Sequence, residues 1–305
     1  MTFEQFFTTA TRDEKHPDGN APYDYQCRLA CGEKQDGESN QAWLERGTDC
    51  ASKLIEIPTG CGKTAAVVMA WLWNRVLQPN AKARAQWPRR LVFCLPMRTL
   101  VEQTRDNVRI WLSNLGDREW KVEGKHDGKI GLHILMGGEE KTDWDLYPEH
   151  DAILIGTQDM LLSRALNRGY GMSRYRWPMH FGLLNNDCLC VLDETQLMGP
   201  GVGTAAQLEA FRTTTSFGSL PGSRSVTWYA SATTNAEQLI TREWRDERRP
   251  ESFRFGLSDG EKAATTGPLA QRRLAWKSIQ CHRSDWNFGD KQVTNRADEN
   301  HSPPS

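Results

Sequence analysis

The sequence predicts an α/β fold in which a mostly parallel central sheet lies between two layers of helices. Short apolar runs recur along the chain, and helix-like stretches separate most of them. Because the runs are continuously apolar, we expect strands buried on both faces, and strands that alternate with helices form parallel sheets with right-handed crossovers. The six expected strands span residues 52–57, 91–95, 132–136, 152–155, 188–192 and 225–230.

Two helices follow most directly from the residue pattern. Apolar residues at helical spacing run over 66–77, directly after the first expected strand, and Pro79 ends the pattern. A second helix is expected over 99–115, where Gly116 ends it. The stretch 139–151 holds six acids and one lysine, so we expect a solvated loop there.

The composition is that of a globular protein with one substantial core. Of the 305 residues, 38% are hydrophobic and 25% are charged. With 38 basic and 39 acidic residues the net charge is -1, so affinity for nucleic acid must come from a local patch. The longest apolar run, 65–73, is far below the roughly 18 residues of a membrane span. The first twenty residues lack a continuous apolar core, and we expect a cytoplasmic protein without a membrane partner.

The eight cysteines are explained best one by one. Three of them fall in expected strands, namely Cys94, Cys188 and Cys190. Buried thiols there behave as small hydrophobic side chains. Cys27 and Cys31 have the i,i+4 spacing of a helix, and with Cys50 they could bind a metal ion only if a fourth ligand folded beside them.

A glycine-rich loop between an expected strand and an expected helix is the first chemical signal. It comprises Pro58, Thr59, Gly60, Cys61, Gly62, Lys63 and Thr64. Its two glycines allow the backbone to curl so that N–H groups and the helix N-terminus face phosphates. Lys63 would bind the β and γ oxygens, and Thr64 would bind magnesium. The general pattern has glycine where this chain has Ile57, and a glycine turn without function is the alternative.

Two acids at the carboxyl end of an expected strand form the second signal. Asp193 would hold Mg²⁺ through water, and Glu194 would orient the water that attacks the γ phosphate. Gln196 belongs to the same motif and is a further catalytic candidate. Such an acidic pair can also cap a helix, an alternative that loses weight beside the phosphate loop.

The third signal is Ser231-Ala232-Thr233, at the end of the sixth expected strand. These small residues could bond the acidic motif and report the phosphate state, which makes them candidate coupling residues. Small polar residues after a strand are also common in ordinary turns, so these residues indicate a function only through their position relative to the other two segments. A P-loop kinase of small metabolites would share the first motif but does not require the third, and it is the least favoured alternative.

In this order and spacing, the three segments resemble the motifs of the DExD/H-box helicases of superfamily 2 across residues 22–236. The resemblance implies a three-layer αβα RecA-like P-loop NTPase domain that binds ATP and Mg²⁺. It also implies that Gln26, in a segment similar to the Q motif, reads adenine. Two further segments resemble motifs that contact the DNA backbone. From them we take Pro96, Arg98, Thr99, Gly156 and Thr157 as DNA contacts.

A narrower resemblance rests on Asp-Glu-x-Gln-Leu-Met at 193–198, in place of Asp-Glu-x-His, and on two segments before it, 168–171 and 174–178. These look like the helicase of type I CRISPR systems, and the type U (also called G) lineage matches best. The resemblance implies ATP-driven 3′ to 5′ movement on single-stranded DNA, after recruitment to a CRISPR surveillance complex in antiviral defense. We assign no nuclease, because the two His-Asp pairs, at 126–127 and 150–151, stand beside polar loops.

The segment 160–186 is a candidate DNA contact on its own residues, because it has four arginines, three interleaved aromatic residues and no acid. They are Arg164, Arg168, Arg174 and Arg176, with Tyr170, Tyr175 and Trp177. Arginines neutralise phosphates and aromatic faces stack on bases, so we take Arg174 and Arg176 as DNA-binding residues. An insertion whose aromatic side chains pack against the sheet is an equally weighted alternative, and the two are compatible.

We expect three parts along the chain. Residues 1–50 form an N-terminal helical segment with the Q motif, and residues 51–240 form the first RecA-like ATPase domain. Residues 241–305 are a linker or the truncated start of a second motor domain, with a disordered end after Gly289. The arginine finger of the family would then come from a second motor half, in cis or in trans. The rival interpretation is a truncated, catalytically inactive nucleotide- or DNA-binding remnant of such a helicase.

Overall fold

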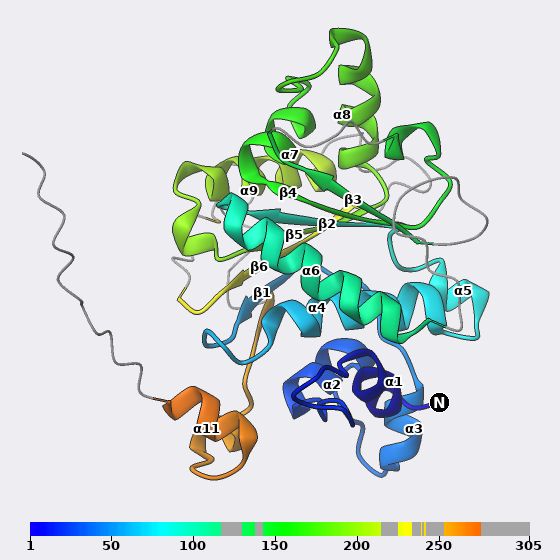
Figure 1. Ribbon diagram of the computed structural model, residues 1–305, viewed down its shortest axis with the longest axis vertical. Helices are drawn as coiled ribbons and strands as arrows, with labels where there is room; N and C mark the ends of the chain where they lie inside the picture. The colour runs from blue at the N-terminus through cyan, green and yellow to red at the C-terminus, as the bar shows by residue number, and fades with distance from the viewer. Residues whose placement is uncertain are drawn as a thin grey trace, which may run out of the picture. The chain divides into compact units, whose positions relative to one another are not determined.

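The computed structural model describes residues 1–116, 130–137, 143–214, 225–233, 239, 241 and 253–275. Its centre is a seven-stranded sheet with the strand order β3-β4-β2-β5-β6-β1-β7, in which every neighbouring pair is parallel. Helices cover both faces of this sheet, which confirms the predicted three-layer αβα fold (Figure 1). The chain divides into a compact unit, Met1–Arg273, and a second unit, Leu274–Ser305, of which only the first two residues are described.

The strands are β1 (Lys53–Glu56), β2 (Arg90–Leu95), β3 (Gly131–Leu135), β4 (Ala152–Thr157), β5 (Cys188–Asp193), β6 (Ser225–Ser231) and β7 (Arg254–Gly256). The six predicted strands are confirmed to within two residues at each end. No strand was predicted where β7 lies. It has three residues, none of them fully buried, so the apolar run that marks the other strands is missing.

The helices are α1 (Phe3–Ala10), α2 (Asp24–Cys31), α3 (Asn40–Glu45), α4 (Lys63–Trp71), α5 (Ala81–Arg84), α6 (Arg98–Asn114), α7 (Gln158–Ala165), α8 (Trp177–Asn185), α9 (Pro200–Thr214), α10 (Asp259–Ala263) and α11 (Pro268–Leu274). A π-helical stretch (Leu72–Leu77) continues α4, and short 3₁₀ turns span Trp144–Leu146, Arg174–Arg176 and Thr195–Leu197. The two helices predicted from the sequence are therefore confirmed as α4 with its π-helical extension and as α6.

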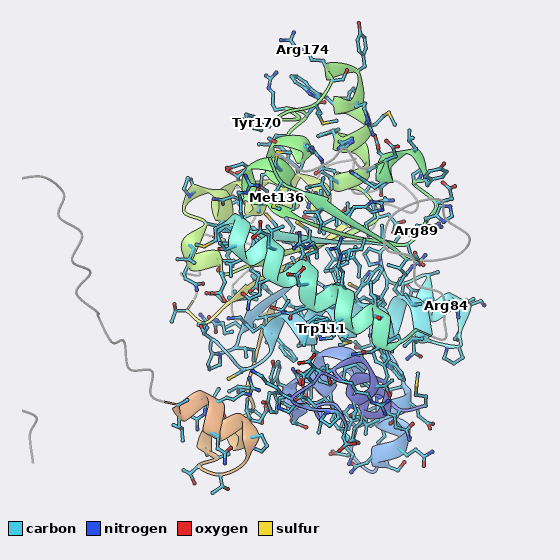
Figure 2. All side chains as sticks on the ribbon, in the orientation of Figure 1. Arg84, Arg89, Trp111, Met136, Tyr170 and Arg174 are labelled. Atoms are coloured by element: carbon cyan, nitrogen blue, oxygen red, sulfur yellow. The ribbon has the colours of Figure 1, made fainter. Side chains whose placement is uncertain are left out.

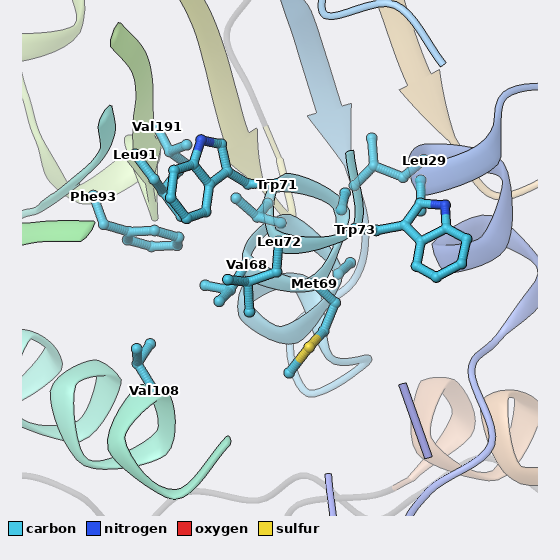
Figure 3. Packing of buried hydrophobic residues seen from close by; sticks show 14 of the residues in the cluster. Leu29, Val68, Met69, Trp71, Leu72, Trp73, Leu91, Phe93, Val108 and Val191 are labelled. Carbon is cyan, nitrogen blue, oxygen red and sulfur yellow. The ribbon is translucent and has the colours of Figure 1, made fainter. Parts of the chain in front are cut away.

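Successive residues of the central strands fill two different cores. On β2, Leu91 and Phe93 belong to the core under α4 and α6, whereas Val92 and Cys94 belong to the core under α7, α8 and α9. Figure 3 shows Trp71 of α4 directed toward Leu91 and Phe93. Because both faces of the sheet are covered, its inner strands have no polar side, and this is why the sequence shows unbroken apolar runs.

The first helices anchor the N-terminal segment to the α4 side of the sheet. The rings of Phe3 and Phe6 on α1 are fully buried and lie 5.7 and 5.9 Å from the ring of Trp73. Full burial of a phenylalanine contributes about 1.5–3 kcal/mol, so α1 is a substantial attachment. The attachment places α2, which carries Tyr25 and Gln26, beside α4.

Some expectations concern parts of the chain that are not described. The His-Asp pair at 126–127 and the end expected to be disordered after Gly289 both lie outside the described residues. Among the helices that are described, none is long and apolar enough to cross a membrane.

Candidate functional site

The sheet topology brings the three motif segments to one edge. The phosphate loop follows β1, the acidic pair ends β5, and Ser231 ends β6. Strands β5, β6 and β1 are neighbours in the sheet and all parallel, so their carboxyl ends lie side by side. Open parallel sheets bind their ligands at this edge. Segments that are far apart in the sequence therefore form one candidate site.

The phosphate loop has the backbone conformation that its glycines allow. Gly60 and Gly62 have φ angles of +83° and +81°, in the left-handed region that other residues avoid. A Cβ atom on Gly62 would lie 2.9 Å from the side-chain nitrogen of Gln26, so this position also lacks space. Helix α4 begins at Lys63, directly after the loop, and its N-terminus adds the partial positive charge that favours anions.

Lys63 connects the loop to the acidic pair. Its ammonium group donates to the carbonyl oxygen of Ile57 at 3.2 Å and lies 3.4 Å from a carboxylate oxygen of Glu194. The lysine is only 6% exposed. A buried ammonium group needs compensation, and in this structure Glu194 and one backbone carbonyl supply it.

Asp193 faces the first turn of α4. The hydroxyl of Thr64 lies 3.5 Å from Asp193 Oδ2, and the N–H of Glu194 donates to Asp193 Oδ1 at 2.9 Å. Burial of the carboxylate raises the pKa of Asp193 to about 6, an effect that Lys63 opposes and Glu194 adds to. The two oxygen groups, Thr64 and Asp193, are of the hard type that Mg²⁺ prefers.

A polar chain runs from the acidic pair to the end of β6. The side-chain nitrogen of Gln196 donates to Glu194, and its side-chain oxygen accepts from Ser231. The Ser231 hydroxyl also accepts the N–H of Thr233 at 3.1 Å. Glu194 itself has a φ of +55°, an uncommon conformation for a residue with a side chain. The structure thus brings Lys63, Glu194, Gln196 and Ser231 together. Ala232 lies between Ser231 and Thr233 in the sequence.

Gln26 and Tyr25 hold the back of the phosphate loop. Gln26 Oε1 accepts the N–H of Tyr23 at 2.8 Å, and its Nε2 donates to the carbonyl of Gly62 at 3.1 Å. The hydroxyl of Tyr25 donates to the carbonyl of Cys61 at 2.6 Å. Both ends of the Gln26 amide thus contact the protein, and the role of Gln26 toward adenine stays a prediction. The loop contact of Tyr25 was missed, because the sequence does not show where a tyrosine hydroxyl points.

The residues expected to contact DNA follow the two strands beside β5. Pro96, Arg98 and Thr99 come after β2, and Gly156 and Thr157 end β4. Strands β2 and β4 pair in register, with Thr157 opposite Leu95. Arg98 and Thr99 are exposed, so their side chains are free to meet a ligand at this edge. The carboxyl edge therefore has one half for the phosphate-loop motifs and one half for these segments.

The arginine-rich segment projects between α7 and α8 with its members in different environments. Arg174 is exposed, with its guanidinium carbon 5.8 Å from the ring centroid of Trp177. Figure 2 shows Arg174 near the top of the view, with Tyr170 below it. Arg176 instead pairs with Asp145, whose side chain is fully buried and lies 3.1 Å from His180 Nε2. The two predicted DNA contacts therefore have different surroundings.

Asp145 corrects the expectation for the acidic stretch 139–151. Asp145 and Trp144 are buried, so the part of this stretch that is described is not simply a solvated loop. Burial alone would raise the pKa of the Asp145 carboxyl, but hydrogen bonds from His180 and Arg176 outweigh burial and hold its pKa well below the usual range. The partners are distant in sequence, so composition could not reveal this burial.

Most of the described cysteines are buried thiols. Cys94 and Cys188 are fully buried, and burial raises the pKa of the Cys190 thiol to about 11. Within the described part of the chain no group of three or more His, Cys, Asp or Glu side chains could hold a metal ion. Three described cysteines, Cys27, Cys31 and Cys50, thus do not form the ligand set that their spacing left open.

A parallel sheet with a phosphate loop, an acidic pair and a hydroxylated third segment on neighbouring strands defines a RecA-like domain of the helicase type. Residues 39–240 match the DEAD/DEAH box helicase family. The chain belongs to this family. A comparison with curated proteins gives no match.

Several solved structures are similar in fold. A DUF1998 helicase, MrfA, bound to DNA and AMPPNP is 17% identical with a TM-score of 0.48, over 84% of this chain and 29% of that chain. The Pyrococcus furiosus Hef helicase domain is 14% identical with a TM-score of 0.41, over 75% and 38%. S. cerevisiae Dbp5 bound to RNA and ADP BeF3 is 15% identical with a TM-score of 0.40, over 78% and 47%. The chain therefore spans less than half the length of each of these proteins.

Proposed function

We propose that the chain is the ATP-binding first RecA-like domain of an ATP-dependent DNA helicase or translocase. One observation carries the proposal: the ammonium group of Lys63 lies 3.4 Å from Glu194, while Thr64 lies 3.5 Å from Asp193. A lysine suited to phosphate, two oxygen groups suited to Mg²⁺ and a carboxylate that could orient water are thus neighbours. These are the parts that phosphoryl transfer from ATP to water requires.

The residues present fit ATP and Mg²⁺. The N–H groups of the loop from Pro58 to Thr64 and the N-terminus of α4 would bind the phosphates, and Lys63 would exchange Glu194 for phosphate oxygens. Thr64 and Asp193 would hold Mg²⁺, which neutralises charge on the phosphates when it is bound. Glu194, released from Lys63, would orient and deprotonate the attacking water.

Gln196 and Ser231 would link the nucleotide to the rest of the domain. Because the Gln196 amide contacts Glu194 at one end and Ser231 at the other, a change at Glu194 alters both contacts. We propose that this series of hydrogen bonds, together with Thr233, couples the phosphate state to nucleic-acid binding. The nucleic-acid contacts would be Pro96, Arg98, Thr99, Gly156 and Thr157 on the same sheet edge, with Arg174 on the projecting segment, and single-stranded DNA is the proposed partner.

The proposed wider role is that of a helicase of a type I CRISPR system, closest to type U, which acts in the cytoplasm beside a surveillance complex. The support is the Asp-Glu-x-Gln-Leu-Met sequence at 193–198 and the arginine and aromatic residues at 168–178. Unwinding would use a second RecA-like domain, supplied in cis or in trans. A binding assay with purified surveillance complex, with and without its DNA target, tests this role. Binding that does not depend on the target would contradict it.

Hydrolysis separates the enzyme from an inactive remnant. Single-turnover and steady-state ATP hydrolysis would be measured with and without single-stranded DNA, for the chain and for Lys63→Ala. DNA-stimulated turnover that Lys63→Ala lacks supports the enzyme. Nucleotide binding without turnover supports the remnant, and turnover that an added phosphoryl acceptor stimulates, but DNA does not, supports a kinase.

A further inference from the structure

Residues 253–273 return to the elements that hold the phosphate loop. Strand β7 pairs with β1, the strand that leads into the loop. On α10, Glu261 accepts the N–H of Tyr25 at 2.9 Å and pairs with Arg28 at 2.9 Å. The side chains of Arg28 and Glu261 are only 12% and 10% exposed, so this is a largely buried ion pair. The segment is thereby fixed to α2 and β1 and not merely tethered to the sheet.

Helix α11 carries two adjacent arginines with different environments. Arg273 is half-buried and donates to the carbonyl of Ala264 at 2.8 Å, which holds the connection between α10 and α11. Arg272 is exposed and donates to the carbonyl of Gly60 at 3.3 Å, across 212 positions of sequence. Gly60 stands in the middle of the phosphate loop, so Arg272 brings a positive charge to that loop from the far end of the unit.

Among the described residues, Arg272 uses little of its hydrogen-bonding capacity. A guanidinium group has five N–H donors, and within the described residues the carbonyl of Gly60 takes one of them. No carboxylate among those residues pairs with it. Among the described residues, no atom beyond Gly60 and its two chain neighbours lies within 4 Å of the position where a Cβ atom would stand on Gly60. An exposed cation thus stands at an open rim of a loop whose backbone suits phosphate.

Tyr23 belongs to the same rim. Burial raises the pKa of Tyr23, and the positive charge of Arg272 acts in the opposite direction, as expected for neighbouring groups. The Tyr23 ring stacks on Tyr25 with centroids 6.2 Å apart, and the Tyr25 hydroxyl donates to Cys61 of the loop. Arg272 thus contacts the phosphate loop directly, and Tyr23 reaches it through Tyr25.

We propose that Arg272 is a further nucleotide-binding residue, which contacts phosphate oxygens of ATP or ADP from the rim of the loop. The inference rests on the proposed ATP binding and adds a residue from a segment that follows the sheet. A simpler role would be to satisfy the Gly60 carbonyl. The two roles need different chemistry, because the carbonyl needs one N–H donor, whereas phosphate oxygens need the positive charge.

Two substitutions separate these roles. Arg272→Gln keeps an N–H donor for Gly60 but removes the charge, and Arg272→Lys keeps the charge. Lys262→Gln is the matched control, because Lys262 is exposed on the same segment and pairs only with Asp259, at 3.5 Å, among the described residues. The measurement is the dissociation constant of fluorescent ATP and ADP analogues with Mg²⁺, at low and at high salt.

We expect Arg272→Gln to bind both analogues about tenfold more weakly, the effect of losing one charge-assisted hydrogen bond. Arg272→Lys should stay within about threefold of the unmodified chain, and the loss in Arg272→Gln should shrink as salt screens the charge. Affinity retained in Arg272→Gln, or lost equally in Arg272→Gln and Arg272→Lys, would overturn the role of Arg272. The proposed ATP site would still stand in that case if Lys63→Ala loses nucleotide binding. If the unmodified chain binds neither analogue, the proposed function is wrong and this inference with it.

Discussion

Ser231 donates a hydrogen bond to the side-chain oxygen of Gln196, whose nitrogen donates to Glu194. The side chain of Gln196 therefore joins the end of β6 to the acidic pair at the end of β5. Lys63, which lies in the phosphate loop, pairs with Glu194 and so extends this series of contacts to the loop. The three motif segments are thus connected by direct polar contacts.

The Gln196 amide is expected to be essential for turnover. Gln196→Glu removes the donor to Glu194 and places a second negative charge beside it, which disfavours the ionised Glu194 that the attacking water needs. Single-turnover hydrolysis should fall by up to about 10²–10⁴-fold, the range of general-base contributions. Gln41→Glu is a matched control, because Gln41 also donates to a glutamate, Glu45, at 3.1 Å on the exposed α3. Equal rates in both variants would contradict the role of Gln196.

The two glycines of the phosphate loop should differ in their tolerance of a side chain. Gly60→Ala places alanine at a φ of +83° in open space, which costs about 1–2 kcal/mol of folding free energy. Gly62→Ala carries the same conformational cost and also forces its Cβ to within 2.9 Å of Gln26. Denaturant unfolding should show the greater loss for Gly62→Ala. If Gly60→Ala proves the more damaging, the described loop geometry is wrong.

Asp145 should contribute stability that depends on pH. Asp145→Asn removes the charge that pairs with Arg176 and His180, and breaking a buried pair costs about 3–5 kcal/mol at neutral pH. The folded-state pKa of Asp145 lies below the ordinary value, so its contribution is complete above about pH 5 and is lost as the pH falls toward the folded pKa.

Denaturant unfolding of both proteins between pH 7 and pH 2.5 measures this contribution. The difference between the unmodified chain and Asp145→Asn should shrink as the pH falls. Asp143→Asn, on the same turn but with 65% of its side chain exposed, should cost little at any pH. A difference that is constant over the whole pH range would contradict the account of Asp145.

Substitution by alanine should have different effects at the two predicted DNA-binding arginines. Arg174→Ala should weaken binding to a single-stranded oligonucleotide and lower the slope of its salt dependence by about one unit, because one phosphate contact is lost. Arg176→Ala should mainly lower the free energy of unfolding, because it leaves Asp145 without its arginine partner. Fluorescence anisotropy at several salt concentrations, with Lys82→Ala as an exposed control, distinguishes the two. An unchanged affinity and slope in Arg174→Ala would remove the projecting segment from the DNA site.

The sequence predicts the sheet and the site's location because both depend on local patterns. An apolar run such as 152–155 marks a strand buried on both faces, and the loop after β1 has glycines that only a turn would need. The missed features depend on distant partners. The burial of Asp145 follows from Arg176 and His180, some thirty residues away, and no local pattern marks that pairing.

Two other features also could not be predicted from local sequence patterns, one at the edge of the sheet and one at the rim of the site. Strand β7 has three residues at an edge, where burial on both faces is not required, so it carries no apolar run. The contact between Arg272 and Gly60 joins residues that are 212 positions apart. No local pattern in the sequence indicates this contact, and only the fold shows that Arg272 reaches the phosphate loop.

Magnesium-dependent ATP binding tests the central claim most directly. Equilibrium titration of the chain with a fluorescent ATP analogue, with and without Mg²⁺, should give saturable binding that Mg²⁺ strengthens. Lys63→Ala should abolish binding, because it removes the buried ammonium group that stands beside Glu194 at the base of the loop. Undetectable binding by the unmodified chain, or equal affinity in Lys63→Ala, would contradict the assignment of this edge of the sheet as a nucleotide site.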